Sequence, residues 1–171
     1  MKRLLILALA IVGLVACSQK HATDTVEVPG QRLERGAPVY VIVPQPGMHE
    51  GKQYPASGIQ TAQAAVVALS PYARATAGGS PETLDSARQR AQRAGAVYIV
   101  EPTILNWEDR ATEWSGRPDR ITIKLVVWDT RSGKEVASTL ARASSKWGTF
   151  GGDHPQDLLP QLMANFFGRI Y

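Results

Sequence analysis

An acidic and a basic side chain stand next to each other late in the chain, at Asp153 and His154. A neighbouring carboxylate and imidazole can act as a general acid and base, and both groups bind divalent metals. This pair would therefore suit a hydrolase or a metal-dependent enzyme. Such chemistry needs further groups that converge on the same point, because one dipeptide does not make a site.

Groups that could complete such a site are scarce. The other two histidines, His21 and His49, fall in a polar leader and in a predicted loop, and a single cysteine leaves no zinc cluster of Cys and His. Glu108 and Asp109 are adjacent, and adjacent residues of a strand point to opposite faces. We therefore expect no enzyme, no metal and no cofactor, and we keep the hydrolase or metal-dependent enzyme as the alternative.

A structural role explains the loop around this pair without any ligand. Gly151 and Gly152 allow a tight reversal of the chain, and Asp153 can cap the backbone donors of a helix that starts near Pro155. We expect Gly151, Gly152, Asp153 and His154 to form such a structural loop.

The one cysteine, Cys17, offers a different chemistry, because its thiol can carry a lipid. It follows two positive charges, Lys2 and Arg3, and an apolar run of 12 residues from Leu4 to Val15. Since about 20 residues are needed to cross a bilayer, this run is typical of a secretory signal. The box Leu-Val-Ala-Cys at 14–17 resembles the lipobox of bacterial lipoproteins.

That resemblance implies that residues 1–16 are a lipoprotein signal peptide and that Cys17 is acylated, for example with palmitate, after cleavage. Ser18 follows the cysteine where Asp would favour the inner membrane, so the implied location is the outer membrane of a Gram-negative cell, facing the periplasm. We expect residues 17–37 to be the lipidated cysteine and a flexible tether, and residues 38–171 to be a single α/β domain.

The charge of the chain excludes one class of partner. The formal charge of +4 falls to +2 in the mature chain, which keeps 17 basic and 15 acidic residues after the loss of Lys2 and Arg3. No basic run with interleaved aromatic residues occurs, so no nucleic-acid partner is expected.

Hydrophobic periodicity predicts five strands and three helices in the order β-α-β-α-β-β-β-α. Two crossovers followed by a meander indicate a single mixed sheet with the helices packed on it, an α/β fold. We expect strands at 39–43, 74–78, 96–100, 120–128 and 135–145. We expect helices from a capping box at Ser57 to Pro71, from a cap at Ser80 to Gly95, and from Pro155 onward.

The segment 104–120 holds two tryptophans among many charges. Tryptophan and arginine often anchor protein interfaces, whereas surface ion pairs add only about 0–1 kcal/mol each to stability. A docking surface and a purely structural hairpin, with charges paired across its strands, are equally consistent with this composition. The candidate contact surface is Trp107, Glu108, Asp109, Arg110, Glu113, Trp114, Arg117, Asp119 and Arg120.

Three motifs behind the lipobox carry a family resemblance. SGIQTAQAA at 57–65, EDRATEWSGRPDR at 108–120 and GGDHPQDLLP at 151–160 are together similar to a family of small Gram-negative lipoproteins known only as a domain of unknown function. More loosely, the order of elements is similar to that of the N-terminal domain of TolB and of the lipoprotein activators of peptidoglycan synthases. The resemblance implies a non-enzymatic adaptor or envelope assembly module that binds an envelope protein. Binding to peptidoglycan is the second alternative, and the oligomeric state stays open.

Overall fold

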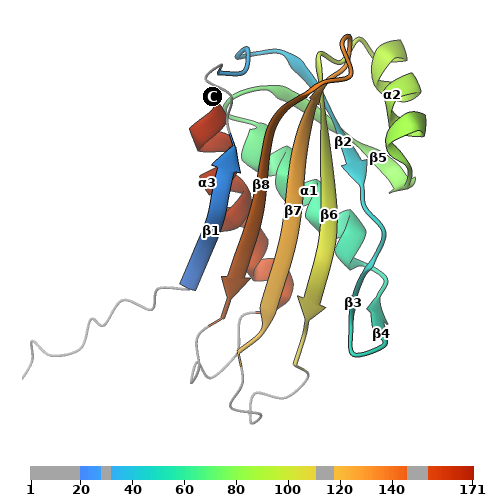
Figure 1. The fold of residues 1–171 in the computed structure, drawn as a ribbon. Helices are drawn as coiled ribbons and strands as arrows, with labels where there is room; N and C mark the ends of the chain where they lie inside the picture. The colour runs from blue at the N-terminus through green and yellow to red at the C-terminus, as the bar shows by residue number, and fades with distance from the viewer. Residues whose placement is uncertain (1–19, 28–31, 111–117, 146–153) are drawn as a thin grey trace, which may run out of the picture.

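Six strands form one mixed sheet in the computed structural model, which describes residues 20–27, 32–110, 118–145 and 154–171 (Figure 1). The strand order is β1-β8-β7-β6-β2-β5. β2 runs parallel to both β5 and β6, and the remaining pairs are antiparallel. The strands are β1 (Lys20–Glu27), β2 (Pro38–Val43), β5 (Arg74–Pro81), β6 (Tyr98–Glu108), β7 (Arg120–Asp129) and β8 (Glu135–Ser144).

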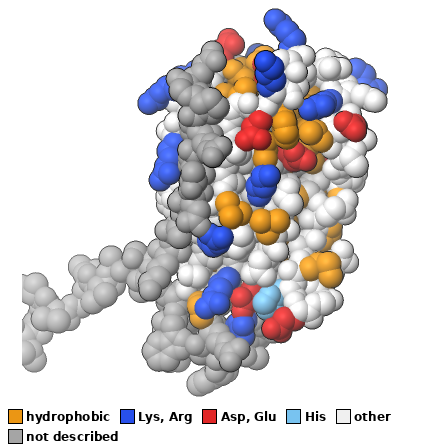
Figure 2. Space-filling view, viewed as in Figure 1, with side chains coloured by type: hydrophobic (Ala, Val, Ile, Leu, Met, Phe, Trp, Pro, Cys, Tyr) orange, Lys and Arg blue, Asp and Glu red, His pale blue; other side chains and the backbone are white. Residues whose placement is uncertain are grey.

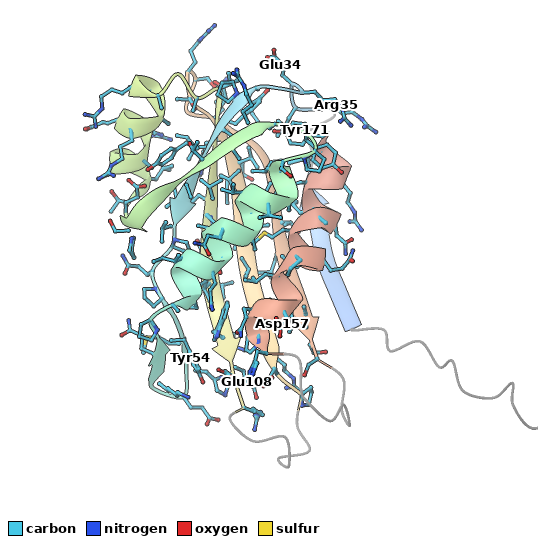
Figure 3. The ribbon with its side chains drawn as sticks, turned by 180° about the vertical axis from the view of Figure 1, so that it is seen from behind. Glu34, Arg35, Tyr54, Glu108, Asp157 and Tyr171 are labelled. Carbon is cyan, nitrogen blue, oxygen red and sulfur yellow. The ribbon has the colours of Figure 1, made fainter. Side chains whose placement is uncertain are left out.

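Three helices pack on this sheet, which confirms the expected α/β class. α1 (Ser57–Leu69) and α3 (Leu159–Ile170) lie across one face, as the view from behind shows (Figure 3), and the short helix η2 (Pro155–Leu158) leads into α3. α2 (Leu84–Arg93) covers the other face at β2 and β6. In the described ranges no helix is both long and apolar enough to span a membrane.

The main core lies between the sheet and the helices α1 and α3. β7 shows why, because every second residue, Ile121, Ile123, Leu125 and Val127, is buried on this side. Phe166 on α3 is fully buried against the same cluster. A smaller cluster under α2 joins the buried Tyr40, Ile42 and Ile99 to Ala87 and Ala91.

The residues expected to form a flexible tether include a strand. Lys20–Glu27 makes β1, which pairs antiparallel with β8 from Lys20 opposite Ser144 to Glu27 opposite Ser138. The polar sequence of β1 lacks clear alternation, and the backbone of β8 supplies the pairing that its side chains do not predict. Only two residues separate Cys17 from β1.

A small hairpin was also absent from the predicted elements. β3 (Gly47–His49) and β4 (Lys52–Tyr54) pair in a stretch that the sequence marks only as a turn. Its two strands are three residues each, too short for periodicity to reveal.

The predicted capping box of α1 is wrong, because Ser57 does a different job. Its Oγ accepts a hydrogen bond from the N–H of Gly47 at 2.7 Å and donates one to the carbonyl of Tyr54 at 2.7 Å. The cap position is Ala56, which makes no side-chain cap. Ser57 therefore ties the β3–β4 hairpin to the start of α1.

The predicted start of α2 is wrong as well. Ser80 and Pro81 are the last residues of β5, and Thr83 caps the helix by accepting from the N–H of Ser86. Gly95, at a φ of +68°, supplies the predicted left-handed stop.

Tyr40 links β2 to the segment before α2 through a partly buried hydrogen bond. Its hydroxyl donates to Glu82 Oε1 at 2.6 Å, and Arg90 Nε lies 3.3 Å from Glu82 Oε2. Burial, reinforced by the hydrogen bond to Glu82, raises the pKa of Tyr40 from 10.0 to about 12. Gly78 lies beside this pair, and a Cβ there would lie 2.9 Å from the Tyr40 hydroxyl.

We expect Tyr40→Phe to make the protein less sensitive to alkaline pH. Since the pKa is higher in the folded state, the contribution of the phenol is complete below about pH 10 and is lost as pH rises through about 12. The stability lost over this range should shrink by about 1–3 kcal/mol in the variant, as measured by urea unfolding at both ends of the range. Tyr171 also has a pKa raised to about 12 by burial and is present in both proteins, so equal losses would contradict the role of Tyr40.

Candidate functional site: a charged cluster at the strand ends

Four strand ends meet at one end of the sheet. Glu108 at the end of β6 pairs with Arg120 at the start of β7, which pairs with Ser144 at the end of β8. Ser144 also pairs with Lys20, the first residue of β1. Acidic, basic and histidine side chains gather at this lower end of the molecule (Figure 2). We call the following group the strand-end cluster: His49, Glu108, Asp109, Arg110, Asp119 and His154.

A register shift in β6 decides which side chains face the core and which face the cluster. Ile104 pairs with Ile123, but Asn106 pairs with Thr122, so Leu105 is the extra residue and is 55% exposed. The shift turns Trp107 inward, where it is 2% exposed. The next residue, Glu108, ends β6 at the cluster.

Glu108 is a buried carboxylate with a matched cation. Arg110 Nε donates to Glu108 Oε1 at 2.5 Å, and Nη2 of the same guanidinium also contacts this oxygen. His49 Nε2 lies 3.8 Å from the same oxygen, and its Nδ1 lies 3.0 Å from Asn106 Oδ1. The charge of Glu108 is therefore balanced within the cluster.

Asp119 is fixed by hydrogen bonds with Arg110 and Ser145. Its Oδ1 accepts from the N–H of Arg110 at 2.7 Å. Its own N–H donates to Ser145 Oγ at 2.9 Å, and the Ser145 N–H donates to its carbonyl at 3.0 Å. Burial raises the pKa of Asp119 above its usual range; the Arg110 N–H opposes this, and the charge of Asp109 adds to it.

His154 reaches the cluster from the segment that precedes η2. The Nδ1 atom of its ring lies 3.6 Å from Asp109 Oδ1, and its backbone N–H donates to Asp157 Oδ2 at 2.9 Å. Tyr54, from the β3–β4 hairpin, donates to the carbonyl of Asp109 at 3.3 Å. Ligand atoms of Asp109, Asp119 and His154 all lie within 4.8 Å of one another. Glu108 and Asp157 lie at this same end in Figure 3.

The structure corrects part of the candidate contact surface. Trp107 is a core residue, and Glu108 and Asp119 are buried, so these three cannot form a surface for a partner. Asp109 and Arg110 are partly exposed, and Arg120 is exposed. The other members, Glu113, Trp114 and Arg117, lie outside the described residues, as do Gly151, Gly152 and Asp153 of the predicted structural loop.

Sequence reasoning missed that the two candidate segments form one site. His154 was paired with its neighbour Asp153, whereas the fold brings it to Asp109 and Asp119. His49 enters from the small hairpin, and no sequence signal connects it to Glu108, which lies 59 positions away. The site is assembled by strand pairing, and single-sequence patterns do not report pairing partners.

A pocket with a volume of about 390 Å³ lies at the opposite end of the sheet. Arg32, Tyr98, Asp129 and Lys134 are among the residues that line it. It contains no residue of the strand-end cluster and no candidate from the sequence.

The described residues form an α/β domain. Its mixed sheet of six strands has two helices on one face and one on the other, and charged side chains gather at one end of the strands. The chain belongs to the family described as a domain of unknown function (DUF4823), whose sequence profile matches residues 31–170. This confirms the family resemblance of the motifs. No curated protein matches the chain.

Several solved structures are similar to this chain at low sequence identity. A PelC dodecamer from Paraburkholderia phytofirmans is 15% identical with a TM-score of 0.64, covering 90% of this chain and 97% of that one. Lipoprotein GNA1162 from Neisseria meningitidis is 16% identical with a TM-score of 0.46, over 78% of this chain and 97% of that one. The LpoB C-terminal domain from Salmonella enterica is 14% identical with a TM-score of 0.43, over 67% and 86%. The likeness to PelC establishes a shared fold.

Proposed function

We propose that the protein is an envelope lipoprotein, acylated at Cys17 and held on the periplasmic face of the outer membrane. Its α/β domain is a non-enzymatic adaptor that binds an envelope protein close to the bilayer. The observation that carries this proposal is the start of β1 at Lys20, only three residues after the acylated cysteine.

Strand register determines which end of the domain such an anchor holds at the membrane. Lys20 lies opposite Ser144, Ser144 opposite Arg120, and Arg120 opposite Glu108. Three extended residues reach only about 10 Å, so a lipid on Cys17 would keep the strand-end cluster near the bilayer surface. The opposite end, with the β7–β8 turn, would face the periplasm.

Two observations support an adaptor. Arg120 is exposed beside the cluster, and arginine is enriched where proteins bind one another. PelC, whose fold the domain shares, is a dodecamer, so this fold is compatible with assembly into an oligomer. Another copy of this chain is therefore included among the envelope partners we propose.

Photocrosslinking in intact cells tests the adaptor, with a photoreactive residue placed at Arg120 or at Arg131. Both positions are exposed, but Arg131 lies in the turn at the far end of β7. We expect a discrete adduct, with an envelope protein or a second copy, from Arg120 and none from Arg131. Equal labelling from both positions, or no adduct together with an unchanged phenotype of Arg120→Ala cells, would contradict the proposal.

Isolated cell-wall sacculi provide the test of the second alternative. Co-sedimentation of the protein with sacculi that weakens as salt rises would favour a peptidoglycan-binding module, because exposed charges are screened by salt. An adaptor that contacts only proteins stays in the supernatant.

A further inference from the structure

The strand-end cluster contains one group of side chains that adaptor function does not use. Asp109 follows β6, Asp119 precedes β7 and His154 precedes η2, so three separate elements deliver them to one place. We propose that Asp109, Asp119 and His154 form a binding site for a divalent transition-metal cation such as Zn²⁺.

The spacing of the ligand atoms fits such an ion. Zinc bonds of about 2.0–2.2 Å place neighbouring ligand atoms of a tetrahedral site roughly 3.3–3.6 Å apart. His154 Nδ1 and Asp109 Oδ1 are already 3.6 Å apart. The whole set lies within 4.8 Å, so closing the site takes a shift of about 1 Å, and the Asp109 and His154 side chains are partly or largely exposed.

The charge of the cluster favours a cation. Arg110 binds Glu108, so the guanidinium matches that carboxylate. Asp109 and Asp119 remain as two carboxylates, and a ring nitrogen of His154 lies within 4.8 Å of an oxygen of each. Asp119 is 8% exposed, and a buried carboxylate next to a second one is costly unless a positive charge balances it.

Neighbouring groups hold each ligand in place. Asp119 is fixed by the Arg110 N–H and by Ser145, Asp109 by the Tyr54 hydroxyl on its carbonyl, and His154 by Asp157. Of these contacts only the one to Asp119 Oδ1 holds a ligand group directly, whereas Tyr54 and Asp157 hold the backbone of Asp109 and His154. An ionised carboxylate has about four lone-pair sites, so the hydrogen bond to Asp119 Oδ1 leaves room for a metal.

The ligand types select the kind of cation. An imidazole suits Zn²⁺ and its neighbours in the first transition row, whereas Ca²⁺ and Mg²⁺ prefer oxygen ligands. The His154 side chain is 61% exposed, which gives an ion access from solvent and leaves a fourth position for water. Three protein ligands with one open position form a site from which a metal can be exchanged.

Calorimetric titration of the full chain in detergent, stripped with a chelator, provides the test with Zn²⁺ as the probe. We expect one saturable site, and Co²⁺ in its place should give the visible bands of tetrahedral coordination. His154→Gln should weaken Zn²⁺ binding by about tenfold or more, because it removes the one nitrogen ligand. Since His154 is exposed, this variant keeps the fold, which circular dichroism checks.

His49→Gln is the matched control. His49 contacts Glu108 in the same cluster but is not one of the three ligands, so this variant should bind Zn²⁺ as the unmodified protein does. Absence of saturable binding, or equal loss in His49→Gln and His154→Gln, overturns the site. Asp109→Asn provides a second ligand variant, and unchanged affinity there would also overturn it. Neither result bears on acylation or on crosslinking from Arg120.

Discussion

Replacing Trp107 with alanine is expected to lower the free energy of unfolding by about 3–5 kcal/mol, the cost of deleting a large buried aromatic side chain. Trp107 is 2% exposed and belongs to the main core. It also supports the β3–β4 hairpin, because a Cβ on Gly47 would lie 2.6 Å from the Cβ of Trp107. Urea denaturation of the purified protein measures the effect, and a domain with a total stability of about 5–15 kcal/mol would be left near its limit.

Arg120→Ala is the control for this prediction. Arg120 is exposed at the start of the strand that pairs with β6, so its removal should change stability by no more than about 0.5 kcal/mol. A Trp107→Ala protein that unfolds at the same urea concentration as the original protein would show that the indole is not part of the core.

Replacing Cys17 with serine is expected to abolish incorporation of fatty acid. A hydroxyl cannot replace the thiol that a lipoprotein signal presents, and each buried methylene of an acyl chain contributes about 0.8 kcal/mol to membrane binding. One chain anchors only marginally, whereas the several chains of a lipoprotein give lasting attachment. Metabolic labelling with a fatty-acid analogue, followed by the intact mass of the protein, measures the change.

Ser18→Ala provides the comparison for the cysteine variant. The substitution keeps the thiol of Cys17, so labelling should be unchanged. Position 18 also precedes β1, so folding should be unchanged. Fatty acid that persists on Cys17→Ser protein would remove the basis for the anchor and for the orientation derived from it.

The fold was predictable wherever side-chain periodicity is strong. The alternation in β7 predicted its buried face, and Gly95 predicted the end of α2. Elements held by backbone pairing were missed. β1 carries polar residues, and the β3–β4 hairpin is too short for a period to appear.

The candidate site was predictable in composition but not in exposure. The sequence identified the charges at the strand ends as one group. It did not predict that the extra residue Leu105 turns Trp107 inward, because no sequence pattern indicates such a bulge. Charge alone also suggested that Glu108 is exposed. Its burial depends on Arg110, because the guanidinium supplies hydrogen bonds and compensating charge.

β1 also determines where a purified fragment of the domain should begin. The family match begins at residue 31, which suggests that a fragment from there onward is complete. Such a fragment would lack the strand that seals β8 and would leave its N–H and C=O groups unpaired along an open edge. Open edges recruit further strands, so β1 should protect the domain from edge-to-edge aggregation.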